Sequence, residues 1–60
     1  MYTMKVFLGT DGLWYVRDDD PRIREEFGTD TLPTPWRKSV PPEKVLGELR
    51  VLNPDRYIIL

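Results

Sequence analysis

The sequence predicts one small α+β domain spanning residues 1–60, with one main α-helix packed on one face of a small antiparallel-type sheet. Three observations lead to this prediction. Two strand-like segments flank a glycine-containing turn early in the chain, an apolar helical period occupies residues 42–52, and a short apolar run follows at residues 56–60. The expected order is strand, strand, short helix, extended proline-containing segment, main helix and strand.

Residues 2–8 and 13–17 are predicted to form a β-hairpin around the turn Gly9-Thr10-Asp11-Gly12. Two registers compete, because a shift of one residue moves every side chain of one strand to the other face. A two-residue Asp-Gly loop mixes polar and apolar residues on both faces, whereas a three-residue loop with Gly12 in the left-handed region separates them. We therefore expect the second register. Its apolar face holds Met4, Val6, Leu8, Trp14 and Val16.

The segment of residues 18–30 is acidic, with six acids against two bases, and is expected to be a surface insertion between strands. Asp20 as N-cap, Pro21 at the first helical position and Gly28 as a left-handed stop predict a short helix. A helix of this length depends on tertiary contacts for its stability.

Residues 31–36 are predicted to be extended, since Pro33 and Pro35 fix their own φ and push the preceding residue out of the helical region. A proline cannot donate a hydrogen bond to a neighbouring strand, which confines the segment to an edge strand or a strapped loop. Trp36 is expected to fold onto the main helix, because a small core needs its large side chains.

The main helix is predicted over residues 42–52. Pro42 suits its first position, and Glu43 favours the positive end of the helix dipole. The apolar stripe consists of Val45, Leu46, Leu49 and Leu52. Asn53-Pro54-Asp55 ends the helix, because Pro54 cannot continue it. The four apolar residues after Arg56 have high strand propensity and no polar alternation, which indicates an inner strand.

The composition restricts the classes of function. The chain has 60 residues, no cysteine and no histidine, which excludes disulfides and metal sites built on thiolates or imidazoles. No apolar run approaches the roughly 20 residues that span a bilayer, and the first residues lack the features of a signal peptide, so we expect a cytoplasmic protein. The net charge of −1 argues against a duplex-binding protein.

Five acidic residues form a candidate binding loop: Asp18, Asp19, Asp20, Glu25 and Glu26. Carboxylate oxygens are suitable ligands for a hard cation, but the spacing matches no calcium loop. The favoured interpretation is a solvated loop with helix-capping aspartates, so no bound metal and no cofactor is expected.

Catalysis is not expected. Ser39 is the only serine, and without histidine or cysteine the common base-assisted nucleophiles cannot be assembled. A chain of this length also has little room for a pocket that excludes water. The sequence therefore predicts a protein that is not an enzyme.

The second face of the hairpin carries two aromatic and two basic residues. They are Lys5, Phe7, Tyr15 and Arg17, with Tyr57 or Ile58 of the last strand as candidate additions. One helix covers one face of a small sheet, so this face is expected to stay open. Three interpretations remain: a cross-strand pair that only stabilises the hairpin, a protein-binding patch, or a surface for single-stranded nucleic acid.

We expect a small non-catalytic module that binds another protein or a second copy of itself. One concrete version is an inhibitor or accessory protein of a phage or mobile element that blocks a larger host complex such as a polymerase, nuclease or defence machinery. The alternatives are a single-stranded nucleic-acid binder and a metal-binding acidic loop. The element order is loosely similar to that of HicB-like antitoxin domains, but no motif is shared beyond an aromatic second strand, and no family or function is assigned.

Overall fold

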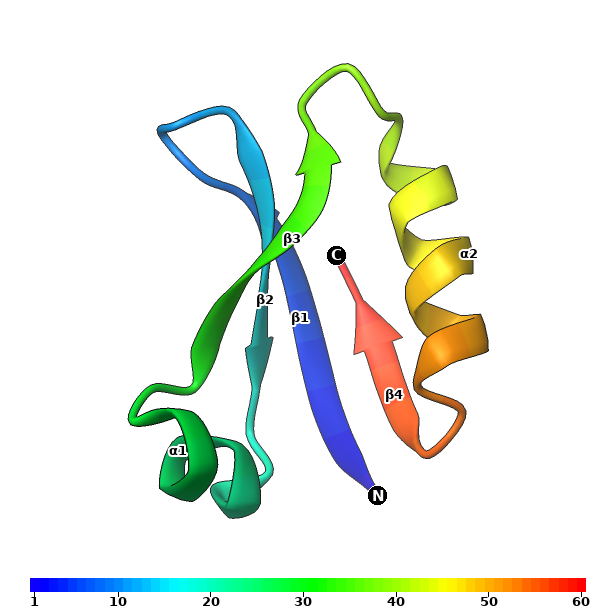
Figure 1. The fold of residues 1–60 in the computed structure, drawn as a ribbon. Helices are drawn as coiled ribbons and strands as arrows, with labels where there is room; N and C mark the ends of the chain where they lie inside the picture. The colour runs from blue at the N-terminus through cyan, green and yellow to red at the C-terminus, as the bar shows by residue number, and fades with distance from the viewer.

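The computed structural model describes all 60 residues and confirms the predicted fold class, a four-stranded sheet with one main helix on one side (Figure 1). The element order is the predicted one. The elements are β1 (Tyr2–Leu8), β2 (Leu13–Asp18), α1 (Pro21–Phe27), β3 (Thr31–Arg37), α2 (Pro42–Leu52) and β4 (Arg56–Ile59). In Figure 1, α2 runs along one side of the sheet and α1 lies beyond the carboxyl end of β2.

The sheet is mixed, with the strand order β3-β2-β1-β4. β1, β2 and β3 are antiparallel as predicted, whereas β4 pairs parallel to β1. The reason is the crossover through α2, which returns the chain in the direction of β3 and β1. The interpretation of β4 as an inner strand is wrong, because β4 forms one edge of the sheet. Its Ile58 is buried, but Tyr57 is 59% exposed.

The hairpin adopts the predicted three-residue register. Leu8 pairs with Trp14, and Val6 pairs with Val16. Gly12 has a φ of 83°, the left-handed conformation that this loop requires. The pairing continues to Met4 opposite Asp18, so that aspartate lies on the same side of the sheet as the core.

β3 is an edge strand, as its two prolines predict. Its pairing with β2 is irregular between Leu13 and Tyr15, next to Pro33 and Pro35. Thr34 is buried there, and its hydroxyl donates a hydrogen bond of 2.7 Å to the carbonyl of Trp14. The side chain thereby holds β3 to β2 at the point where the pairing of the two strands is irregular.

The core lies between the sheet and α2. Seven residues form it: Met4, Val6, Trp14, Val16, Val45, Leu49 and Ile58. Trp36 packs against this cluster, as predicted. Leu8 and Leu52 were predicted to be buried but are 47% and 67% exposed. Each is the last residue of its element, where the opposing layer no longer covers it.

The helix leaves part of its own side of the sheet open. An open groove of about 280 Å³ lies between α2 and β3. Its walls include Leu32, Trp36, Leu49 and Leu52, and the charged residues at it are Asp18 and Arg56. The accessible surface of the whole chain, 4275 Å², is nevertheless close to the roughly 4,100 Å² expected of a monomer of its mass. The exposed surface area is therefore that of an ordinary folded monomer of this size.

Candidate functional site

The side of the sheet that faces away from α2 carries no helix (Figure 1). We call it the outer sheet face, and it holds all five predicted binding residues. They are Lys5, Phe7, Tyr15, Arg17 and Tyr57. Phe7 pairs with Tyr15 and Lys5 pairs with Arg17 across β1 and β2, while Tyr57 lies opposite Thr3 on β4. Ile58, the other candidate, points into the core, and its neighbour Ile59 shares the outer side with Lys5.

The centre of the outer sheet face is a stacked aromatic pair. The rings of Phe7 and Tyr15 lie 5.8 Å apart between centroids, at an interplanar angle of 16°. The Tyr15 hydroxyl donates a hydrogen bond of 2.5 Å to Asp11 Oδ2, and the other Asp11 oxygen accepts from the Leu13 N–H at 3.1 Å. The bond from Tyr15 lowers the pKa of the Asp11 carboxyl, and Asp11 in turn raises the pKa of Tyr15. The ring is thus fixed at both ends.

Gly9 sets the position of the Tyr15 ring. A Cβ atom at Gly9 would lie 2.7 Å from Cδ1 of Tyr15 and closer still to Cε1. The φ of Gly9 is not in the left-handed region, so the backbone alone does not require glycine here. The ring requires it, because it lies directly on the glycine. Sequence reasoning assigned Gly9 only to the turn, although an aromatic residue across from a strand-end glycine is a known arrangement.

The two bases of the outer sheet face differ in their surroundings. Arg17 Nε lies 3.3 Å from Asp30 Oδ2, an exposed ion pair. A hydrogen bond from the Thr31 hydroxyl is the main cause of the lowered pKa of Asp30, and the charge of Arg17 adds to it. Lys5 takes part in no ion pair and is exposed. The face therefore has one unpaired positive charge beside its aromatic centre.

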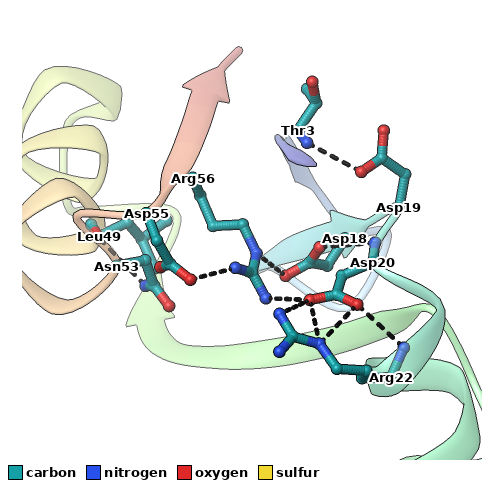
Figure 2. A network of polar contacts seen from close by, with 9 residues as sticks. All are labelled: Thr3, Asp18, Asp19, Asp20, Arg22, Leu49, Asn53, Asp55 and Arg56. Carbon is teal, nitrogen blue, oxygen red and sulfur yellow. Dashed lines mark hydrogen bonds and ion pairs between the residues drawn. The ribbon is translucent and has the colours of Figure 1, made fainter. Parts of the chain in front are cut away.

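The predicted acidic loop does not form one site. Asp18 and Asp20 are buried, Asp19 is exposed, and Glu25 and Glu26 lie on the solvent side of α1. Asp19 accepts a 2.8 Å hydrogen bond from the N–H of Thr3, as Figure 2 shows. No group of three or more acidic side chains converges on a point that would hold a metal ion. The interpretation as a solvated loop is wrong for Asp18 and Asp20.

The two buried aspartates contact Arg56 instead (Figure 2). Arg56 Nε lies 2.8 Å from Asp18 Oδ2, and Arg56 Nη2 lies 2.7 Å from Asp20 Oδ2. Asp55 contacts the third nitrogen at 2.5 Å, and Arg22 contacts Asp20 at 2.6 Å. We call these five residues the Arg56 network. The Arg56 side chain is only 9% exposed, so its charge is compensated within the fold.

Asp20 has two structural functions. It caps α1, because Oδ1 accepts a hydrogen bond of 3.0 Å from the N–H of Arg22. Hydrogen bonds from the Arg22 side chain, assisted by the charge of Arg56, lower the pKa of Asp20 to about 2. Sequence reasoning identified the cap but missed Arg56. One sequence feature could have indicated this contact. The acidic run directly follows the second strand, so its first carboxylates lie at the end of the sheet, where another strand can begin.

Comparisons with protein-family models, with curated proteins and with solved structures gave no match. Neither helix has the length and the apolar character needed to cross a lipid bilayer.

Proposed function

We propose that this chain is a small non-catalytic module that binds another protein through the outer sheet face. The observation that carries this proposal is the exposure of a complete sheet face with a fixed aromatic centre. Phe7 is 38% exposed and Tyr57 is 59% exposed, and both lie on that face with Lys5. Aromatic residues and arginine are enriched in protein interfaces, and Arg17 supplies the arginine on this face.

The contacts of the face favour a protein over single-stranded nucleic acid. Phe7 and Tyr15 stack on each other, which occupies one side of each ring that a base would need. The carboxylates of Asp11 and Asp30 lie at the rim and contact Tyr15 and Arg17. Those negative charges oppose the approach of phosphates, and only Lys5 is left to attract them.

Other features of the structure support a role without catalysis. The groove between α2 and β3 contains Asp18 and Arg56, but these two groups are paired with each other. Every buried side-chain nitrogen or oxygen has a hydrogen-bond partner within the chain. A binder of this kind acts by covering a surface of its partner, which is the inhibitory or accessory role that we propose. Because the chain has no cysteine, we place this role in the reducing cytoplasm.

The test compares two surface variants with the wild-type protein. Phe7→Ser with Tyr15→Ser removes the aromatic centre, and Val51→Ser on α2 is the matched control, because Val51 is 78% exposed and lies outside the face. Each immobilised protein is incubated with extract of the source cells, after circular dichroism has verified its fold. We expect proteins that the wild type and the control retain and the double variant loses. Equal retention by all three contradicts the proposal.

A second measurement separates the nucleic-acid alternative. Labelled single-stranded oligonucleotides are titrated with the wild type at low and at high salt. Binding that weakens steeply with salt and disappears in the Phe7→Ser, Tyr15→Ser variant would assign the face to nucleic acid and overturn the proposal.

A further inference from the structure

The two edges of the sheet differ in their capacity to accept another strand. At the β3 edge, Pro33 and Pro35 lack the N–H groups that a new strand would bind. The β4 edge, Arg56–Ile59, contains no proline. Its one charged side chain, Arg56, points into the Arg56 network. It therefore does not oppose the pairing of another strand with this edge. The β4 edge thus offers free backbone groups to an extended partner, a type of edge that natural proteins normally protect.

The neighbouring flank of α2 carries an acid near its start, a leucine and a glycine at its middle, and a base near its end. Four residues of α2 share this flank, because spacings of three, four and seven residues return to the same side of a helix. They are Glu43, Leu46, Gly47 and Arg50. Arg50 lines the same surface hollow as Tyr57 and Ile58 of β4, so the flank lies on the side of the free edge. Leu46 is half-buried, whereas the other three are exposed. A Cβ atom at Gly47 would have nothing within 4 Å.

We propose that the β4 edge and this flank of α2 bind a second copy of the chain, with β4 antiparallel to its partner strand around a two-fold axis. A two-fold interface must be self-complementary, because the same patch serves both subunits. When two α2 helices lie antiparallel, with the midpoint between Leu46 and Gly47 on the axis, Glu43 of each meets Arg50 of the other. The acid at one end and the base at the other fit this arrangement.

Gly47 fits the centre of that interface. Glycine inside a helix costs about 1 kcal/mol relative to alanine, and no contact within this chain requires it. In the proposed arrangement Gly47 would lie next to the two-fold axis, and a residue without a side chain there allows the two helices to approach closely. A second copy adds to the free edge a pairing of Glu43 with Arg50, which an unrelated strand would not supply. The charge pattern therefore selects a second copy as the occupant.

The dimer extends the proposed function without depending on it. Pairing of β4 with its partner would join the two sheets into one of eight strands, with both α2 helices on one side. The two outer sheet faces would then form one continuous surface. A strand of four residues and one helix flank make a small interface, so we expect reversible association.

The experiment is the solution mass by light scattering, over concentrations up to about 1 mM, the weak end of specific affinity. We expect the wild type to rise from 7.1 kDa towards twice that mass. Gly47→Lys should stay monomeric while melting no lower than the wild type, since the position is open in the monomer. Glu43→Arg should also stay monomeric, because the new arginine at position 43 of each copy would face Arg50 of the other copy. Adding Arg50→Glu exchanges the charges and should restore the dimer.

A wild-type mass of 7.1 kDa at every concentration overturns the inference. So does a dimer that persists in both Gly47→Lys and Glu43→Arg. A dimer that is lost only in Phe7→Ser with Tyr15→Ser would place self-association on the outer sheet face, which also contradicts it. The binding of a different protein uses that face and not Gly47, so the two proposals fail separately.

Discussion

The guanidinium of Arg56 and the carboxylate of Asp18 meet at 2.8 Å, although the two residues are 38 positions apart in the sequence. Both side chains are more than nine-tenths buried. Their contact ties the start of β4 to the end of β2, two strands that are not neighbours in the sheet. Asp20 joins the start of α1 to the same guanidinium. The Arg56 network thus holds the start of the last strand against the end of β2 and the start of α1.

Replacing Arg56 by methionine should lower the free energy of unfolding by about 3 kcal/mol, because it leaves Asp18 buried without its opposite charge. Arg22→Met is the matched control. The Arg22 side chain is 72% exposed, so its loss should cost under about 1 kcal/mol. Urea unfolding followed by circular dichroism measures both values. Equal losses in the two variants would contradict a dominant role for the buried pair.

Acid should destabilise the fold through Asp20. Its pKa is about 2 in the folded chain and 3.8 as the ordinary value, so the folded state favours the ionised form. The resulting stability is fully present above about pH 4 and is lost as the pH falls towards 2. Unfolding free energies across this range measure the slope. Asp20→Asn should flatten it but not abolish it, since the pKa values of Asp11 and Asp30 are also lowered. An unchanged slope in the variant would show that Asp20 does not carry the effect.

Gly9→Ala and Gly47→Ala should have opposite effects on the monomer. The new Cβ at Gly9 collides with the Tyr15 ring and should cost about 1–3 kcal/mol, whereas Gly47 is open and gains about 1 kcal/mol of helix propensity. Thermal unfolding at micromolar concentration gives both signs. NMR shifts of the Phe7 and Tyr15 rings should change only in Gly9→Ala. A stable Gly9→Ala variant with unchanged ring shifts would mean that Gly9 does not position the ring.

Calcium and magnesium should leave the melting temperature unchanged at millimolar concentration. Asp18 and Asp20 already bind guanidinium groups, and no three acidic side chains are grouped so that they could hold a cation. Differential scanning fluorimetry with and without each ion measures this. A rise in the melting temperature that disappears in Asp19→Ala would restore the acidic loop as a cation site.

Local patterns in the sequence predicted much of the fold. The hairpin register followed from placing Val6 and Leu8 on the same face as Trp14 and Val16, which only one of the two loop lengths allows. The same alternation placed the aromatic and basic residues of the candidate site on one face. The caps and prolines predicted both helices and the edge position of β3, because these signals act within a few residues.

The rest depends on contacts between distant segments. The apolar run after Arg56 suggested an inner strand, but such a run also suits an edge strand that is partly covered by α2. The burial of Asp18 and Asp20 could not be predicted from an acidic run. It depends on Arg56, which supplies the opposite charge from a distant part of the chain. The role of Gly9 depends on which ring lies on it, and that requires the cross-strand geometry.

The parallel pairing of β1 with β4 also bears on the order in which the fold can form. Until residues 56–59 have joined the sheet, Met4 has no strand beside it on the β4 side, and Asp18 has no guanidinium. The remaining segments then hold a hairpin with one open edge and an aspartate without its opposite charge. We expect the native state to form in one cooperative step, at a rate limited by the closure of its most distant strands.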